Sequence, residues 1–269
     1  MFKNVLVVVR GGGDIATGII HRLYRSGFKV IILEIEKPSH IRRKVAFAQV
    51  IYSGEMEIDG IRARYVDDFS EALMCLEEGI IPVMNDGDGE ILKNNKINIL
   101  VDAILAKINL GTKKEMADIF VGVGPGFTAG KDVDAVIESN RGHNLGRVIT
   151  DGSAEPNTGI PGNIGGFSEE RVVRAVSEGE IKVVRDIGSL VKRGDILATI
   201  QDKKVKAKID GVLRGVINDG FYVSKGMKIG DIDPRGIEEN CFTISDKARA
   251  VAGGVLEAVC YLLSTKIKI

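Results

Sequence analysis

The residues best placed to do chemistry lie in a glycine-rich turn near the start of the chain, RGGGDIATG at 10–18. The turn follows an aliphatic run at Val5–Val9 and precedes a helical pattern, so it predicts a strand, a tight turn and a helix N-terminus whose backbone N–H groups can bind phosphate. Glu34 ends the next apolar run, 21 residues after Gly13, where a carboxylate can accept hydrogen bonds from ribose hydroxyls. The candidate binding residues of this unit are Gly11, Gly13, Asp14, Thr17, Gly18 and Glu34.

Asp14 favours a different interpretation of the same turn. A carboxylate at a helix start repels an anion and can satisfy the same N–H groups. A turn that joins strand to helix and binds nothing therefore stays open.

A second glycine-rich turn, GVGPGFTAG at 122–130, also follows a predicted strand. Its Pro125 removes one N–H donor, and a turn that only brings chain segments together is an equal alternative. If both turns lie at the carboxyl ends of strands in one sheet, they flank a single crevice. Gly124 and Gly126 are then further candidate contacts to a ligand.

Four charged or titratable residues complete the candidate site. Asp102 ends a predicted strand, and Lys107 follows it closely. Arg141 and His143 lie on a glycine-flanked loop, where a guanidinium and an imidazole can contact an anion. Structural ion pairs are the alternative for each. No catalytic residue can be assigned, and the spacing of histidines and cysteines predicts no metal site.

The elements that must hold these residues alternate between strands and helices. Aliphatic runs typical of buried parallel strands occur at Val5–Val9, Lys29–Leu33, Ile80–Met84, Ile97–Asp102 and Ile119–Val123. Asp59-Gly60 predicts a hairpin turn, and 245–263 is an amphipathic helix with Ser245 as its N-cap. Gly253 and Gly254 inside that helix cost stability unless close packing requires them. These patterns predict a Rossmann-like α/β domain with a parallel sheet.

From Gly179 onward the pattern changes to short strands with an internal repeat. Val191 and Gly194 recur as Val223 and Gly226, at a constant offset of 32 residues, which predicts two interlocked β-halves. The segment resembles a biotinyl/lipoyl-like barrel-sandwich hybrid, although the junction containing Lys203 and Lys204 lacks the methionines that flank a modified lysine in such domains. The expected domains are 1–176 (Rossmann-like), 177–236 (inserted β domain) and 237–269 (a helix returning to the first domain).

Composition excludes several classes of protein. The chain has 269 residues, with 37 basic and 37 acidic side chains, so it lacks the basic surplus of a sequence-independent nucleic-acid binder. No apolar stretch reaches the roughly 18–20 residues of a membrane span. The first residues predict a strand and not a signal peptide. Three widely separated cysteines fit a reducing compartment, so we expect a cytoplasmic protein that contacts neither nucleic acid nor membrane.

The combination of RGGGDIATG, IRRKVAF, VDAILAK, GVGPGFTAGKDVDAVIESNRGHNLGRVI, NTGIPG and CFTISDKARAVAGGVLEA resembles the YqeB-like accessory family over essentially the whole chain. That family is linked to selenium-dependent molybdenum hydroxylases, in the company of XdhC/CoxF maturation factors. The resemblance implies a maturation role and a molybdenum hydroxylase client as partner. It carries over no catalytic residue.

The function expected from these observations is an accessory protein that binds a nucleotide-like or anionic cofactor in a Rossmann-type crevice. The cofactor is unknown, with a nucleotide and a molybdopterin-type cofactor both open, and the expected ligand is small and anionic. The alternatives are an NAD-dependent oxidoreductase with His143 as proton donor, and a ligand-free scaffold that binds a client. Catalysis and homo-oligomerisation stay open.

Overall fold

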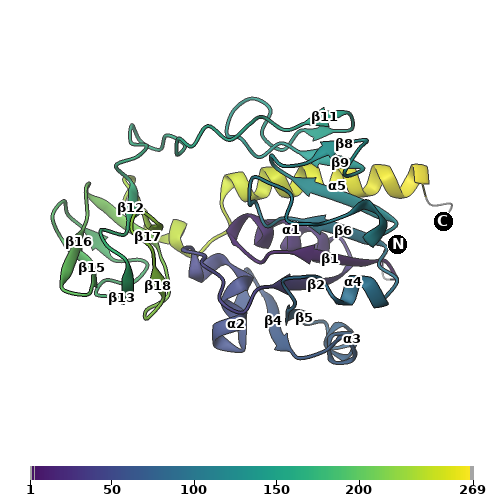
Figure 1. Cartoon of the computed structure of the whole chain (residues 1–269), viewed down its shortest axis with the longest axis horizontal. Helices are drawn as coiled ribbons and strands as arrows, with labels where there is room; N and C mark the ends of the chain where they lie inside the picture. The colour runs from purple at the N-terminus through teal and green to yellow at the C-terminus, as the bar shows by residue number, and fades with distance from the viewer. Residues whose placement is uncertain (1, 3, 267–269) are drawn as a thin grey trace. The chain divides into compact units, whose positions relative to one another are not determined.

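The computed structural model describes residue 2 and residues 4–266, and it divides the chain into two compact units (Figure 1). Unit 1 combines the residues up to Pro38, Ala46–Asn157 and the residues from Ile244 on. Unit 2 combines Ser39–Val45 and Thr158–Thr243. The domain bounds 1–176, 177–236 and 237–269 remain a sequence-based prediction.

Unit 1 is built on a nine-stranded sheet of order β10-β9-β7-β6-β1-β2-β5-β4-β3. Its strands are β1 (Leu6–Arg10), β2 (Lys29–Glu34), β3 (Glu55–Ile58), β4 (Ile61–Val66), β5 (Ile81–Asn85), β6 (Ile99–Asp102), β7 (Ile119–Val123), β9 (Ala135–Ile137) and β10 (Val148–Ile149). A separate pair is formed by β8 (Thr128–Ala129) and β11 (Gly152–Ser153). The helices of unit 1 are α1 (Asp14–Arg25), α2 (Val50–Ser53), α3 (Phe69–Glu77), α4 (Ile91–Asn94) and α5 (Asp246–Lys266), with 3-10 turns at Phe47–Gln49 and Lys114–Met116.

The fold class predicted from the sequence is wrong in its sheet. The seven strands from β9 to β4 pair in parallel, but β10 pairs antiparallel with β9, and β3 pairs antiparallel with β4. The sheet is therefore mixed and not the parallel sheet of a Rossmann-like domain. The physical reason is local: β3 and β4 are joined by the two-residue turn Asp59-Gly60, with φ of 47° and 77°, which reverses the chain.

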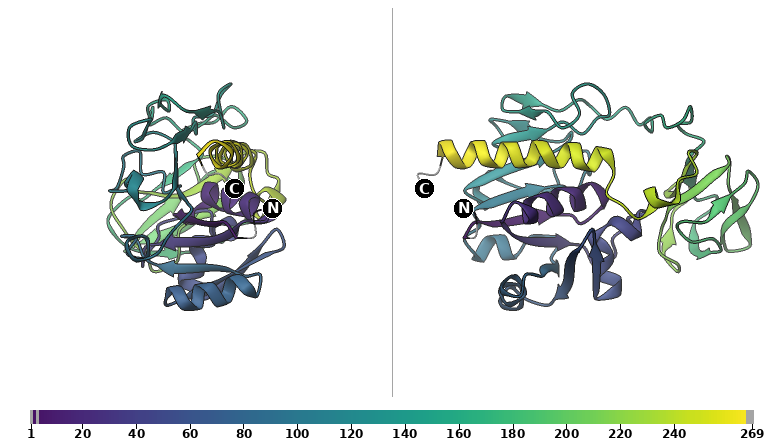
Figure 2. Two further views of the ribbon diagram at one scale, coloured as in Figure 1. Left: turned by 90° about the vertical axis from the view of Figure 1, so that its right-hand side faces the viewer. Right: turned by 180° about the vertical axis from the view of Figure 1, so that it is seen from behind.

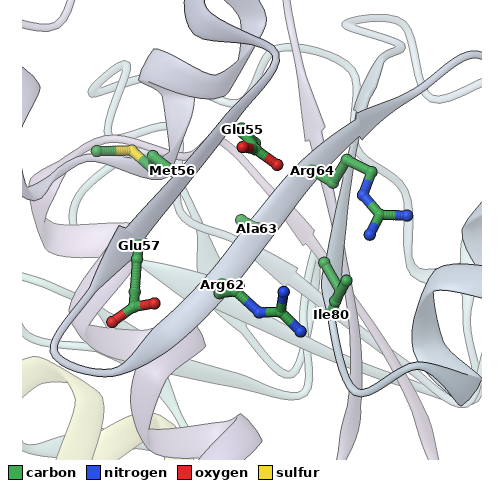
Figure 3. Close-up of a pocket in the computed structure, with 7 residues that line it drawn as sticks. All are labelled: Glu55, Met56, Glu57, Arg62, Ala63, Arg64 and Ile80. Atoms are coloured by element: carbon green, nitrogen blue, oxygen red, sulfur yellow. The ribbon is translucent and has the colours of Figure 1, made fainter.

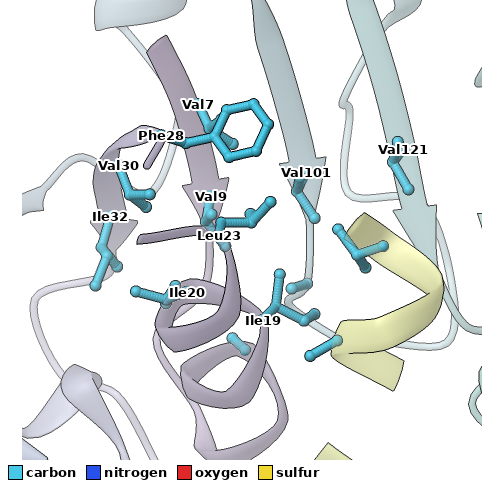
Figure 4. Packing of buried hydrophobic residues seen from close by; sticks show 14 of the residues in the cluster. Val7, Val9, Ile19, Ile20, Leu23, Phe28, Val30, Ile32, Val101 and Val121 are labelled. Atoms are coloured by element: carbon cyan, nitrogen blue, oxygen red, sulfur yellow. The ribbon is translucent and has the colours of Figure 1, made fainter. Parts of the chain in front are cut away.

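Apolar side chains on one face of this sheet pack against α1 and α5 (Figure 4). Val7, Val9 and Val101 of the strands meet Ile19 and Leu23 of α1, and all five are fully buried. The two helices run side by side (Figure 2), so α5 covers α1 and this part of the sheet. The core of unit 1 therefore depends on contacts between the first and the last helix.

Glycines set the close approach of these elements. A Cβ at Gly18 of α1 would lie 2.8 Å from the Cβ of Ala248, and a Cβ at Gly254 of α5 would lie 2.0 Å from the Gly146 carbonyl oxygen. The close packing that the Gly253-Gly254 pair requires is thus confirmed at Gly254. The predicted cap is confirmed as well, since Ser245 Oγ accepts a hydrogen bond from Ala248 N at 3.2 Å.

By length and composition, α5 is the one helix among the described residues that is long and apolar enough to cross a membrane, which corrects the expectation that no stretch reaches that length; half of its most apolar part is buried. Core helices of soluble proteins pass the same test. With its packing against α1, α5 belongs to a soluble-type α/β fold.

Unit 2 contains two four-stranded antiparallel sheets, of order β12-β19-β17-β14 and β16-β15-β13-β18. Its strands are β12 (Val172–Arg174), β13 (Gly179–Val183), β14 (Leu190–Val191), β15 (Ile196–Ile200), β16 (Lys203–Lys206), β17 (Gly211–Val216), β18 (Tyr222–Val223) and β19 (Lys228–Asp233), with 3-10 turns at Arg43–Val45 and Glu238–Cys241.

The strand positions confirm the internal repeat. β13, β14 and β15 begin 32 residues before β17, β18 and β19, respectively. The halves exchange strands, because β14 of the first copy pairs with β17 and β18 of the second copy pairs with β13. Lys203 and Lys204 are exposed at the start of β16.

Candidate functional site

The first glycine turn lies at the carboxyl end of β1, and its three glycines have different surroundings. Gly11 has a φ of +91°, and a Cβ there would lie 3.1 Å from the backbone of Ala103 and Ile104. A Cβ at Gly12 would lie 2.7 Å from Ala48 N. Gly13, the N-cap of α1, has an ordinary φ of −62°, and a Cβ there would meet nothing within 4 Å. Protein therefore fills the space at Gly11 and Gly12, whereas the space at Gly13 is open.

Glu34 occupies part of the glycine turn that the sequence predicts as a phosphate site. Its Oε2 accepts a hydrogen bond from Gly12 N at 2.8 Å, and its Oε1 accepts one from Ile35 N at 2.9 Å. Burial raises the pKa of the Glu34 carboxyl, and the two N–H donors oppose that shift only in part. One N–H group predicted to meet a phosphate is therefore bound by a carboxylate.

Tyr52 of α2 lies within the electrostatic reach of Glu34. Burial, and then the charge of Glu34, raise the pKa of the Tyr52 phenol. Its hydroxyl donates a hydrogen bond to the Pro38 carbonyl oxygen at 2.9 Å. Sequence reasoning missed this residue, because no motif surrounds it.

Two other predicted contacts, Thr17 and Gly18, face protein. Thr17 is fully buried; its Oγ1 donates to the Gly12 carbonyl oxygen at 3.2 Å and accepts from Phe47 N at 2.9 Å. These two hydrogen bonds connect the glycine turn to the segment before α2. The absence of a side chain at Gly18 allows α5 to pack closely against α1. Asp14 is the first residue of α1 and is half-buried.

Asp102, at the carboxyl end of β6, belongs to a buried polar cluster. Its Oδ2 accepts a hydrogen bond from Thr112 Oγ1 at 2.5 Å and lies 3.7 Å from Nη1 of Arg10. Arg10 also donates to Thr112 Oγ1 and, at 2.7 Å, to the Gly87 carbonyl oxygen. Burial raises the pKa of Asp102, against the lowering effects of Thr112 and Arg10. Arg10, which begins the glycine motif, connects the loops containing Gly87 and Thr112 to the carboxyl ends of β1 and β6.

The second glycine turn packs against the chain instead of opening a crevice. A Cβ at Gly124 would lie 2.7 Å from Ser139 Oγ, and one at Gly126 would lie 2.8 Å from the Ile108 backbone. Because residues 103–104 pack against Gly11, the segment 103–108 contacts both turns. Lys107 lies in this segment with a φ of +69°.

Arg141 and His143 lie on the loop after β9. The Arg141 guanidinium makes a paired contact with Asp246 at the start of α5, at 2.7 Å and 3.0 Å. His143 is exposed. The loop is also anchored by Glu138, which is buried and accepts hydrogen bonds from Asn140 N and Glu155 N at 2.6 Å and 2.7 Å.

A cavity of about 260 Å³ lies on the β3–β4 hairpin and not at the carboxyl edge (Figure 3). Acidic side chains of β3 and basic side chains of β4 line it, in cross-strand register. The lining residues are Glu55, Met56, Glu57, Arg62, Ala63, Arg64 and Ile80. The alternation EMEIDGIRAR in the sequence is the signal that predicts such a surface.

Among the described residues, no group of three or more histidine, cysteine, aspartate or glutamate side chains is arranged to hold a metal ion.

The ionisation of Glu34 makes a testable contribution to stability. Because burial raises its pKa, the folded protein keeps a proton that the unfolded chain releases between the ordinary and the raised pKa. The free energy of unfolding should therefore fall as pH rises through this window, and Glu34→Gln should remove that part of the fall. Urea unfolding at a series of pH values measures it. The exposed neighbour substitution Glu36→Gln should leave the wild-type pH dependence; a Glu34→Gln profile parallel to wild type contradicts the assignment.

Comparisons with known proteins add a close relative. No family model matches the chain. It is 52% identical over 263 residues to the uncharacterized protein YqeB of Escherichia coli (strain K12). The match covers 98% of this chain and 49% of that protein, so the chain spans about half the length of the curated relative it matches. YqeB is therefore a homologue.

Three solved structures show a remote likeness. The product-bound ectoine utilization protein EutE (DoeB) from Ruegeria pomeroyi is 10% identical, with 84% of this chain and 56% of that chain covered and a TM-score of 0.23. An aspartoacylase family protein from Mesorhizobium loti is 8% identical, with coverages of 85% and 84% and a TM-score of 0.25. A succinylglutamate desuccinylase from Silicibacter sp. TM1040 is 10% identical, with coverages of 86% and 85% and a TM-score of 0.25. TM-scores this low assign no activity to this chain.

The predicted fold class, a Rossmann-like parallel sheet with a biotinyl/lipoyl-like insertion, is wrong because the sheet of unit 1 is mixed. The solved structures are ectoine-utilization, aspartoacylase and desuccinylase proteins, so they give no support to the predicted function, maturation of selenium-dependent molybdenum hydroxylases in the company of XdhC/CoxF factors. We therefore withdraw that function and its nucleotide-like or anionic cofactor, together with the NAD-dependent oxidoreductase and the ligand-free scaffold.

Proposed function

We propose that unit 1 binds a small molecule that donates hydrogen bonds, either a cation or a polyhydroxyl compound, to Glu34 beside Gly13. The observation that carries the proposal is the half-buried Glu34 carboxylate at the carboxyl end of β2. Each of its oxygens accepts one backbone N–H. An ionised carboxylate has about four acceptor positions, so two remain for a ligand.

Gly13 supports the same location. Its φ of −62° is open to any residue, and a Cβ would meet nothing within 4 Å, so neither backbone conformation nor packing requires glycine there. Gly11 and Gly12 differ, because a Cβ at either position would press on neighbouring backbone. A glycine without a structural need, next to open space, fits a position where a ligand approaches the chain.

Charge decides the class of ligand. Glu34 and Asp14 both lie at the turn, and the Gly12 N–H that an anion would need is already bound by Glu34. An anion would therefore meet a carboxylate where it needs a donor. A cation or a hydroxyl pair meets an acceptor.

A ligand panel tests the proposal. Isothermal titration calorimetry on the full chain compares diamines and amidines, polyols, and phosphate or carboxylate anions. Glu34→Gln should weaken binding of the best ligand by about tenfold or more, as expected for a lost charged hydrogen bond. Gly13→Asn should weaken it similarly, because asparagine is a good N-cap but fills the open space.

The matched control is Glu36→Gln, which removes an exposed carboxylate two residues away. It should leave affinity within about twofold, since an exposed group makes little net contribution. A cation should also bind more tightly as pH rises and Glu34 loses its proton, whereas a polyol should show a smaller pH effect. Binding of a cation or polyol that survives both Glu34→Gln and Gly13→Asn, or a panel in which no cation and no polyol binds, overturns the proposal.

We also propose that the protein acts in the cytoplasm. The support is its three free cysteines, Cys75, Cys241 and Cys260, and the soluble-type fold of unit 1. Burial raises the pKa of all three thiols, which keeps them unreactive. Cell fractionation with an antibody tests the location, and recovery in a membrane or secreted fraction contradicts it.

A further inference from the structure

A second polar cluster lies inside unit 2, on the sheet β12-β19-β17-β14. Arg171 directly precedes β12, Asp231 lies on β19 and Arg214 lies on β17. Arg171 Nη2 is 2.8 Å from Asp231 Oδ2, and Arg214 Nη1 is 3.9 Å from the same oxygen. The side chains of Arg171, Asp231 and Arg214 are only 8%, 5% and 10% exposed, respectively.

Strand irregularity places Arg214 in this cluster. The register between β17 and β19 shifts between Leu213 and Gly215, so Arg214 is the extra residue of a bulge. A bulge re-aims the side chain of its extra residue. At the next position, a Cβ on Gly215 would lie 3.0 Å from the Ile41 carbonyl oxygen, so the segment 39–45 covers this face of the sheet.

The covering segment adds a third buried guanidinium. Arg42 is 5% exposed, and its charge acts on Asp231 together with those of Arg171 and Arg214. The nearby Asp233 is matched by its own partner, Arg235, at 2.6 Å and 2.9 Å. Arg42 itself donates hydrogen bonds to the carbonyl oxygens of Asn240 and Thr243. Two buried guanidinium groups, those of Arg171 and Arg214, thus lie against one carboxylate, Asp231, and Arg42 adds its positive charge nearby. Buried charge in excess of its counter-charge is costly.

Burial also raises the pKa of Asp231, against the lowering effects of Lys228, Arg171 and Arg214. Any protonation of Asp231 would enlarge the cationic surplus.

The cluster also contains hydrogen-bonding atoms that the described residues leave unused. Nε of Arg171 and Nε of Arg214 are buried donors without a hydrogen-bond partner, and Asp231 Oδ1 is a buried acceptor without one. More than nine-tenths of buried polar groups in proteins are satisfied, so such a set points to a bound species. Two donors and one acceptor fit an oxyanion that also carries an O–H group.

We propose that Arg171, Arg214 and Asp231 form a binding site for a protonated phosphate group, as in hydrogen phosphate or a singly protonated phosphate ester. The phosphate oxygens accept hydrogen bonds from the two Nε–H groups. Its O–H donates to Asp231 Oδ1. The negative charge of the ligand balances the surplus of guanidinium groups. This site lies wholly in unit 2 and is independent of Glu34.

The O–H group separates phosphate from sulfate, which carries no proton at neutral pH. Titration calorimetry on the full chain with inorganic phosphate and then sulfate, at one ionic strength, should give at least about tenfold tighter binding of phosphate, the size of one hydrogen bond to a charged group. Phosphate and a phosphate monoester, compared in the same way, distinguish the free ion from an esterified ligand.

Asp231→Asn changes the acceptor into an amide that can also donate. The preference for phosphate over sulfate should therefore fall to about twofold or less in this variant, an effect that loss of packing alone does not produce. Arg171→Gln should weaken phosphate binding by about tenfold or more. The matched control is Arg174→Gln on β12, whose side chain is exposed and pairs with Glu169 at 3.4 Å; it should bind phosphate as wild type does.

Circular dichroism and melting temperatures identify any variant that fails to fold. If Arg171→Gln does not fold, the test depends on two other results: the preference of the wild type for phosphate over sulfate, and the loss of that preference in Asp231→Asn. Equal binding of phosphate and sulfate, binding of neither, or an equal loss in Arg174→Gln and Arg171→Gln overturns the proposal.

Discussion

Replacing Gly254 with alanine should lower the free energy of unfolding of unit 1 by about 3 kcal/mol, the upper part of the range for overpacked cores. A Cβ at Gly254 would lie 2.0 Å from the Gly146 carbonyl oxygen, and backbone cannot move aside as a flexible side chain can. Replacing the neighbouring Gly253 should do the opposite. A Cβ there meets only the end of the Arg22 side chain, at 3.6 Å, so alanine should add up to about 1 kcal/mol of helix propensity.

Urea unfolding of the two variants measures this contrast. The pair is well matched, because both substitutions are Gly→Ala at adjacent positions of one helix. Equal effects at 253 and 254 would contradict the close approach of α5 to the loop containing Gly146.

Asp102→Ala should cost about 3–5 kcal/mol, the usual cost of leaving a buried charge without its partner. Arg10 and Asp102 are 6% and 4% exposed, so water cannot replace the lost carboxylate at the Arg10 guanidinium. Arg10→Met combined with Asp102→Leu should recover much of the loss, because neither charge is then buried. Thr112 still loses its partner in the double variant, which limits the recovery.

The control for this prediction is the exposed pair Arg64–Glu78, whose groups lie 3.0 Å apart. Glu78→Ala should change the free energy of unfolding by less than about 1 kcal/mol. Thermal and urea unfolding of the three variants give the comparison. If Asp102→Ala costs no more than Glu78→Ala, then Asp102 does not stabilise the buried Arg10 at the carboxyl ends of β1 and β6.

The parts of the fold that the sequence predicts are those encoded by local periodicity. The run at 119–123 matches β7 residue for residue, and the run at 29–33 is one residue short of β2. The helix predicted at 245–263 spans Asp246–Lys266, and its cap is Ser245, as expected. Each of these signals is a pattern of residue types within a single helix or a single strand. The antiparallel direction of β10 has no such signal, because this strand contains only two residues.

The candidate site was less predictable because its chemistry depends on distant contacts. The glycine motif predicts free N–H groups, but Glu34 binds Gly12 N from 22 residues away, and Ala103 packs against Gly11. Arg141 contacts Asp246, 105 residues later, and no local pattern indicates that contact. Whether any of the predicted site residues contacts a ligand stays a prediction; they are Gly11, Gly13, Asp14, Thr17, Gly18, Glu34, Asp102, Lys107, Gly124, Gly126, Arg141 and His143. In unit 2, Arg171 and Asp231 meet across 60 residues, with no motif at either position.

The packing of α5 against α1 has a consequence for synthesis on the ribosome. Residues 14–25 emerge well before residues 246–266, so their apolar face and the adjoining face of the sheet stay uncovered until α5 is made. At translation rates of about 5–20 residues per second, that interval lasts roughly 10–50 s. The segment 158–243 emerges within it, so unit 2 can form while unit 1 waits. The nascent chain thus carries exposed apolar surface throughout that interval, which makes it a natural client for chaperones that bind chains at the ribosome.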